Sequence, residues 1–166
     1  MSKAAQKESQ GMSETKAGGH KRILVADDDE GVRFVLTRAL ERLGSGYEIV
    51  TAPNAQEALD RVRAKPFDLV ITDLRMPGMD GVELTKEIKG LNPETTVIWI
   101  TAYGGYEVAD EAARLSVCKC LDKPLKVSEI RQAALEALAA TDSRVSVQQQ
   151  EEESHGATGQ ACCHSV

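Results

Sequence analysis

Four consecutive acidic residues, Asp27 to Glu30, follow directly on the apolar run ILVA. Like charges this close together repel one another, and the repulsion is unfavourable unless a positive group lies among them. Three other residues with chemically active side chains stand at the ends of similar apolar runs, namely Asp73 after FDLVIT, Thr101 after TTVIWI and Lys123 after VCKCLD. These residue types fit a site in which carboxylates hold a positive group beside a hydroxyl and an ammonium.

Short apolar runs of β-strand type alternate with stretches in which apolar residues recur at helical spacing. The expected strands are 22–26, 47–52, 67–73, 95–100 and 117–121. The expected helices are about 32–43, 54–64, 81–90, 106–115 and 127–140. Asn54 and Asp80 are the expected N-caps of the second and third helices. Five β-α units predict an α/β fold, with a mostly parallel sheet covered by helices on both faces. Ligands of such sheets bind beyond the carboxyl ends of the strands, so the acids, Thr101 and Lys123 are expected at one edge.

The sequence predicts one domain flanked by two tails. Residues 1–20 contain no Ile, Leu, Val or aromatic residue, and residues 143–166 combine a Gln run with an acidic run. Both segments are therefore predicted to be disordered, which leaves the domain at 21–142. The second tail is too short and too polar for a DNA-binding or catalytic domain, so we expect output through protein contacts.

Charge and hydropathy narrow the classes of partner. A formal net charge of −6 argues against nucleic acid and anionic membranes as partners. No run approaches the roughly 18 apolar residues that a membrane-spanning helix requires. The N-terminal residues lack the apolar stretch of a signal peptide, so we expect a cytoplasmic protein whose four cysteines are free thiols.

Four motifs carry a resemblance to a known family. The segments ILVADDDE, DLVITDLRMPGMDGVEL, VIWITAYG and LDKPL occur in the order and at the spacing of the receiver domain of two-component response regulators. The resemblance covers about residues 21–140, and the chain looks like a single-domain receiver of the chemotaxis-regulator type. It implies a doubly wound, flavodoxin-like (βα)5 fold whose five parallel strands have the order 2-1-3-4-5.

The same resemblance assigns a metal and a phosphoacceptor. Asp73 matches the family's phosphoacceptor, and a carboxylate can act as a nucleophile that forms an acyl phosphate. Asp28, with help from Asp27, and Asp73 are implied to hold Mg²⁺, which prefers oxygen ligands and keeps several waters. The backbone carbonyl of Arg75 matches a further ligand of the ion.

Two more residues of the resemblance contact the phosphoryl group. Lys123 is implied to pair with its oxygens, and the Lys123–Pro124 peptide is cis in the family. Thr101 is implied to turn inward and hydrogen-bond the phosphoryl group. A histidine kinase or a histidine phosphotransfer protein is the implied donor, and an output protein that the sequence does not identify reads the switched surface. The protein is therefore expected to be a signalling phosphoprotein that assists its own modification, not an enzyme that turns over a metabolite.

Three residues near the site are expected to affect switching and dephosphorylation. Many receivers have an aromatic residue where this chain has Cys120, so the usual coupling of Thr101 to an aromatic side chain is in doubt, and Tyr103 or Tyr106 is the candidate steric substitute. We expect Cys120 itself to be a small buried core thiol. Arg75 and Tyr103 are long enough to lean over the phosphoryl group and hinder an attacking water, which predicts slow self-dephosphorylation.

Two other functions compete with the receiver hypothesis. A phosphatase of the haloacid dehalogenase type also has an aspartate nucleophile after an apolar strand, and Asp27-x-Asp29 fits its motif. That family requires Thr or Val where this chain has Gly31. The second alternative is a binding module that works without phosphorylation and uses its C-terminal tail.

Overall fold

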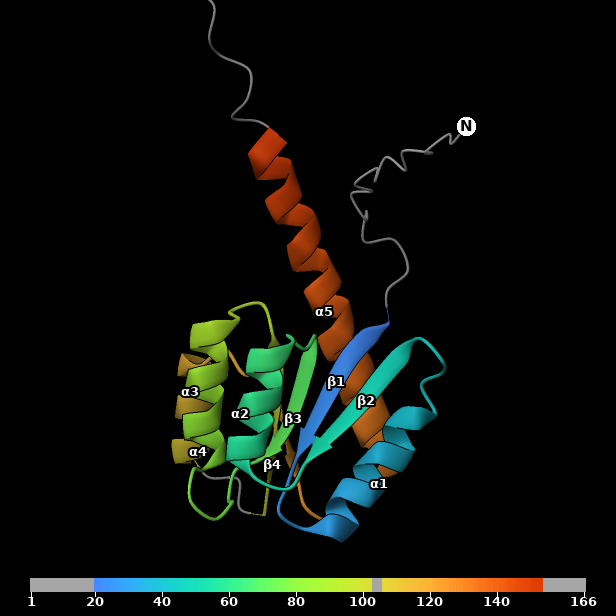
Figure 1. Ribbon diagram of the computed structural model, residues 1–166, viewed down its shortest axis with the longest axis vertical. Coiled ribbons are helices and arrows are strands. Elements are labelled where there is room, and N and C mark those ends of the chain that lie inside the picture. Colours follow the sequence, from blue (N-terminus) through green and yellow to red (C-terminus); the bar gives the residue numbers. More distant parts are fainter. Residues whose placement is uncertain (1–19, 103–105, 154–166) are drawn as a thin grey trace, which may run out of the picture.

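Strands and helices alternate along the chain (Figure 1), and the computed structural model describes residues 20–102 and 106–153, with side chains for 20–102 and 108–141. The strands are β1 (Lys21–Ala26), β2 (Tyr47–Ala52), β3 (Leu69–Asp73), β4 (Thr96–Thr101) and β5 (Lys119–Asp122). The helices are α1 (Glu30–Glu41), α2 (Ala55–Ala64), α3 (Gly81–Leu91), α4 (Tyr106–Arg114) and α5 (Val127–Glu153).

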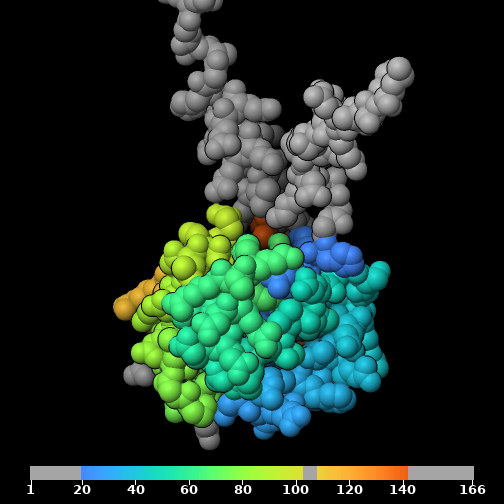
Figure 2. All heavy atoms as spheres, viewed as in Figure 1, coloured from blue at the N-terminus to red at the C-terminus, as the bar shows by residue number. Residues whose placement is uncertain are grey.

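The strands form one parallel sheet in the order β2-β1-β3-β4-β5, which confirms the predicted doubly wound fold. Helices α1 and α5 cover one face and α2, α3 and α4 the other (Figure 1). In the space-filling view, α2 and α3 hide most of the sheet on their face (Figure 2). Every residue of β3 and β4 is buried because both faces of these central strands are covered.

Side-chain caps fix where three of the helices begin. The Asp29 carboxylate caps α1, Asn54 caps α2, and Asp80 forms a capping box with Glu83 at the start of α3. The N-caps predicted for α2 and α3 are thereby confirmed. The caps on α1 and α3 lie in the loops after β1 and β3, so the same turns that start these helices also shape the edge where the acids lie.

Helix α5 is longer than the sequence indicated. The predicted helix covered 127–140, whereas α5 continues to Glu153 and runs past the end of the sheet (Figure 1). It therefore includes 143–153, which the sequence analysis placed in the tail. No Gly or Pro interrupts the chain before Gly156, and Gln and Glu favour helix, so nothing local ends α5 earlier. Residues 1–19 and 154–166 lie outside the described part, so their predicted disorder stays a prediction. No helix in the described part is long and apolar enough to cross a membrane.

Gly81 lets the start of α3 approach the end of β3 closely. A Cβ atom at this position would lie 2.2 Å from the Asp73 carbonyl oxygen and 2.9 Å from Leu74 Cα. The Gly81 amide donates a hydrogen bond of 3.0 Å to the Leu74 carbonyl across the same contact. The loop between β3 and α3 is therefore pressed against the backbone of Asp73.

We expect Gly81→Ala to lower the free energy of unfolding by roughly 1–3 kcal/mol, because the added methyl group overlaps backbone that cannot move freely. Gly90→Ala in the same helix is the matched control, since a Cβ there meets nothing within 4 Å. It should leave stability unchanged or raise it by up to about 1 kcal/mol. Urea denaturation of both variants measures the difference, and equal effects would contradict the close approach.

Candidate functional site

Three carboxylates meet at the carboxyl edge of the sheet. Asp27 and Asp28 follow β1, Asp73 ends β3, and the two strands are neighbours with Ala26 opposite Thr72. One carboxylate oxygen from each acid lies within 4.8 Å of the others. The predicted convergence of these residues is confirmed, although Asp73 lies 45 positions after Asp28 in the chain.

The Lys123 ammonium lies between two of the acids. Its Nζ atom is 3.4 Å from Asp27 Oδ2 and 3.5 Å from Asp73 Oδ2. The strand pairing that aligns β5 with β4 brings it there, and the Lys123 amide donates to the Thr101 carbonyl at 2.8 Å. The Lys123–Pro124 peptide is cis, as the resemblance implied.

The acids outnumber the cations among these groups. Burial raises the pKa of Asp27, and the Asp73 carboxylate acts in the same direction, while the Asp29 amide and Lys123 act against them. Burial also acts to lower the pKa of Lys123, but the Asp27 and Asp73 carboxylates together outweigh it and the pKa rises. Lys123 therefore stays charged, and its ammonium contacts two of the three carboxylates.

This donor set fits a hard divalent cation. All three candidate ligands are carboxylate oxygens, the class that Mg²⁺ prefers, and Asp28 is exposed and able to reach an ion from solvent. The net negative charge of the cluster has the sign that a divalent ion would offset. Asp27 and Asp28 would hold Mg²⁺ together with Asp73, and the ion would neutralise their repulsion and the charge of an incoming phosphoryl group.

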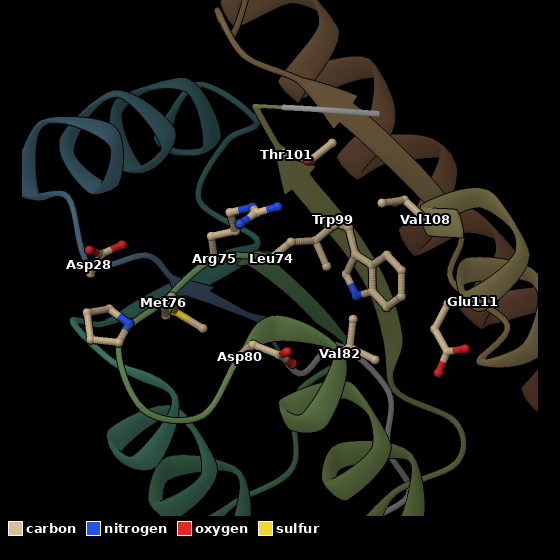
Figure 3. A pocket seen from close by; sticks show the side chains of 11 residues that line it. Asp28, Leu74, Arg75, Met76, Asp80, Val82, Trp99, Thr101, Val108 and Glu111 are labelled. Atoms are coloured by element: carbon tan, nitrogen blue, oxygen red, sulfur yellow. The ribbon is translucent and has the colours of Figure 1, made fainter. Parts of the chain in front are cut away.

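A hollow of about 760 Å³ opens beside the acids, between the loop after β3 and helix α4. Asp28, Arg75, Thr101 and Trp99 are among the residues that line it (Figure 3). Thr101 ends β4 and is buried, whereas the Arg75 side chain is exposed at the rim. The predicted modulating residue Tyr103 lies outside the described residues, as does the side chain of Tyr106.

The predicted burial of Cys120 is wrong. A buried core thiol was expected from the sequence, but Cys120 is exposed. Strand β5 lies at the edge of the sheet, and its buried position is taken by the neighbouring Leu121. Partial burial, with the Asp122 carboxylate second, still raises the pKa of the Cys120 thiol.

Two sets of contacts around the site were not predicted from the sequence. The Trp99 indole donates to Thr85 Oγ1 at 2.8 Å, and Thr85 donates to the Gly81 carbonyl at 2.7 Å, which links β4 to the start of α3. The Arg33 guanidinium donates to the Asp27 carbonyl oxygen at 2.7 Å. Strand alternation could have placed Trp99 on the α3 face, but no sequence pattern indicated the Arg33 contact.

We expect Asp73→Asn to raise the free energy of unfolding of the metal-free protein, because it removes one of three repelling carboxylates. The gain should lie within the roughly 0.5–2 kcal/mol that a single stabilising substitution commonly gives. Urea denaturation in a chelator measures it, with the exposed Asp122→Asn as the control that changes net charge equally. A destabilised Asp73→Asn protein would contradict the repulsion.

The sequence of this chain is similar to those of known response regulators. Residues 23–135 match the family described as Response regulator receiver domain. Over 114 residues the chain is 36% identical to sporulation initiation phosphotransferase F of Bacillus subtilis, with 69% of this chain and 90% of that protein covered. It is 43% identical over 119 residues to transcriptional regulatory protein ZraR of Klebsiella oxytoca, covering 72% of this chain and 26% of ZraR. The chain thus spans about a quarter of that relative's length.

The fold of this chain is also similar to solved structures of receiver domains. A CheY-like response regulator receiver domain protein from Methanospirillum hungatei is similar with a TM-score of 0.70 at 27% identity, covering 75% of this chain and 98% of that one. The receiver domain of NtrX from Brucella abortus gives a TM-score of 0.65 at 33% identity, with 70% and 98% covered. With three carboxylates and a lysine gathered at the sheet edge, these matches show that the chain belongs to the response regulator receiver domain family.

Proposed function

We propose that this protein is a phosphoacceptor response regulator of a two-component phosphorelay, modified on Asp73 by a histidine kinase or a histidine phosphotransfer protein with Mg²⁺. The observation that carries the proposal is the gathering of three carboxylates and Lys123 around one point at the sheet edge. That arrangement suits phosphoryl transfer, which depends mostly on positioning and on neutralising charge.

The residues divide the chemical step among themselves. An Asp73 carboxylate oxygen attacks phosphorus, the bond from phosphorus to the donor's imidazole nitrogen breaks, and the imidazole leaves with the electron pair and takes up a proton. Asp27 and Asp28 would hold Mg²⁺, with the Arg75 carbonyl as a further ligand. The Lys123 ammonium would pair with the phosphoryl oxygens as a compact positive charge, and the Thr101 hydroxyl would turn to hydrogen-bond them.

Helix α4 is the element that this change would bias. It is the next helix after Thr101 in the chain, and the hollow of about 760 Å³ separates its Val108 and Glu111 from the loop after β3. An ion pair of 2.9 Å between Lys86 and Glu111 joins α4 to α3. Inward movement of Thr101 would shift a two-state equilibrium of this helix, and an output protein would read the result.

An apolar surface beside the site supports docking of the phosphodonor. A second hollow of about 290 Å³ lies between α1 and the loop after β5 and includes Val32, Val35, Lys123 and Leu125. Val35, which lines this hollow, is 39% exposed. An apolar surface beside charged groups suits a protein interface, whose apolar core is surrounded by a polar rim.

Accessibility favours Asp73 over Asp27 as the nucleophile, and so favours the receiver over the haloacid-dehalogenase alternative. The Asp27 side chain is fully buried and accepts hydrogen bonds from the Asp29 amide and Lys123, whereas 8% of the Asp73 side chain is exposed. A module that binds its partner without phosphorylation would have no use for such a cluster.

Acetyl phosphate with Mg²⁺ should label the protein with one phosphoryl group on Asp73, because the site supplies both the nucleophile and the charge neutralisation. Intact mass measurement after rapid mixing detects the addition. Asp73→Asn should abolish labelling, and Asp28→Asn should slow it by about tenfold or more through loss of a metal ligand. Labelling or turnover through Asp27 in the Asp73→Asn protein would instead favour the phosphatase.

The Arg75 side chain should slow loss of the phosphoryl group by hindering the approach of water. Arg75→Ser is therefore expected to shorten the lifetime of the aspartyl phosphate severalfold, measured by mass after removal of the donor. Arg63→Ser on α2, which removes an equal charge far from the site, should leave the lifetime unchanged. A wild-type lifetime of only seconds would refute the shielding.

A further inference from the structure

Asp28 is placed by its neighbours and not by its own contacts. Among the described residues its side chain makes no hydrogen bond and no ion pair, and it is exposed. A flexible exposed carboxylate is a poor ligand for Mg²⁺, which requires near-ideal geometry. The position of Asp28 must therefore come from the two peptide units that flank it.

Each flanking peptide is held by one hydrogen bond. The carbonyl oxygen of Asp27 belongs to the peptide that precedes Asp28, and the Arg33 guanidinium donates to it at 2.7 Å. The amide of Asp29 belongs to the peptide that follows, and it donates to Asp27 Oδ1 at 2.8 Å. Because each peptide unit is planar and rigid, the two hydrogen bonds together restrict the Cα of Asp28 at their junction and so the direction of its side chain.

Arg33 is itself held in place by helix α1. Its amide donates to the Asp29 carbonyl at 3.0 Å, and Asp29 caps the helix through the Val32 amide. The guanidinium is half-buried and reaches back over the first turn to the loop. The cap and the Arg33 contact thus clamp the three acids 27–29 from the helix side.

We infer that Arg33 is a positioning residue that fixes the Asp27–Asp28 peptide, and through it the Asp28 carboxylate, for Mg²⁺ binding. The inference rests on the proposed function because it assumes that the acids hold this ion. Arg33 acts through geometry and against its own charge, since a cation beside the acids repels Mg²⁺. Removing it should weaken Mg²⁺ binding by positioning, whereas electrostatics alone would make the ion bind more tightly.

The experiment is a calorimetric titration of MgCl₂ into the metal-free protein, with no phosphodonor present. Arg33→Met keeps the aliphatic stem and removes the donor, and the dissociation constant for Mg²⁺ should rise about tenfold, as when groups that orient metal ligands are removed. Arg33→Lys keeps a positively charged donor, so its dissociation constant for Mg²⁺ should lie between those of the wild type and Arg33→Met. Arg38→Met is the matched control on the same helix, because it removes an equal charge from an exposed arginine paired with Glu41. It should not raise the constant.

Acetyl phosphate labelling supplies a second readout. In Arg33→Met the rate at limiting Mg²⁺ should fall, and saturating Mg²⁺ should restore it to near the wild-type rate. If Arg33→Met does not fold, the intermediate constant expected for Arg33→Lys carries the test. Unchanged or tighter Mg²⁺ binding by Arg33→Met, while the wild type binds normally, overturns the role of Arg33 alone. A wild-type protein that binds no Mg²⁺ overturns this inference together with the proposed function.

Discussion

Repulsion among carboxylates that the fold holds together is the constraint on which this structure depends. Asp27 and Asp28 leave β1, Asp73 ends the adjacent β3, and their oxygens lie within 4.8 Å of one another. Lys123 offsets part of this charge from 3.4 and 3.5 Å. A cluster that remains short of positive charge would attract a divalent cation, and that cation would also offset the charge of an incoming phosphoryl group.

The surrounding packing serves to keep the acids from moving apart. Gly81 brings α3 against the Asp73 backbone, and Thr85 and Trp99 extend this contact to β4. On the other side, the Arg33 guanidinium and the Asp29 cap hold the loop after β1. The strands themselves cannot yield, since both faces of β3 and β4 are covered. Relief of the repulsion is therefore expected from a bound cation or a bound proton and not from movement of the backbone.

Much of this arrangement could be predicted from the sequence because it follows from strand ends. The alternation of runs indicated the parallel sheet, and a parallel sheet brings Asp27, Asp73 and Lys123 to one edge. The strand order came from the resemblance, as alternation alone permits others. Contacts made by side chains across the fold could not be predicted. Arg33 lies on a helix and reaches a backbone carbonyl, and Cys120 is exposed because β5 is an edge strand, which local sequence does not encode. The extent of α5 was missed because polarity indicated a tail where helix propensity continued.

The most direct test of the shared cation is a crystal structure of the protein grown with Mn²⁺ in place of Mg²⁺, analysed by anomalous diffraction. The account predicts one strong peak per chain between Asp28 and Asp73, at about 2.0–2.2 Å from their carboxylate oxygens. A fully formed acidic cluster with no peak among its carboxylates at saturating Mn²⁺, or a peak bound elsewhere, would contradict it.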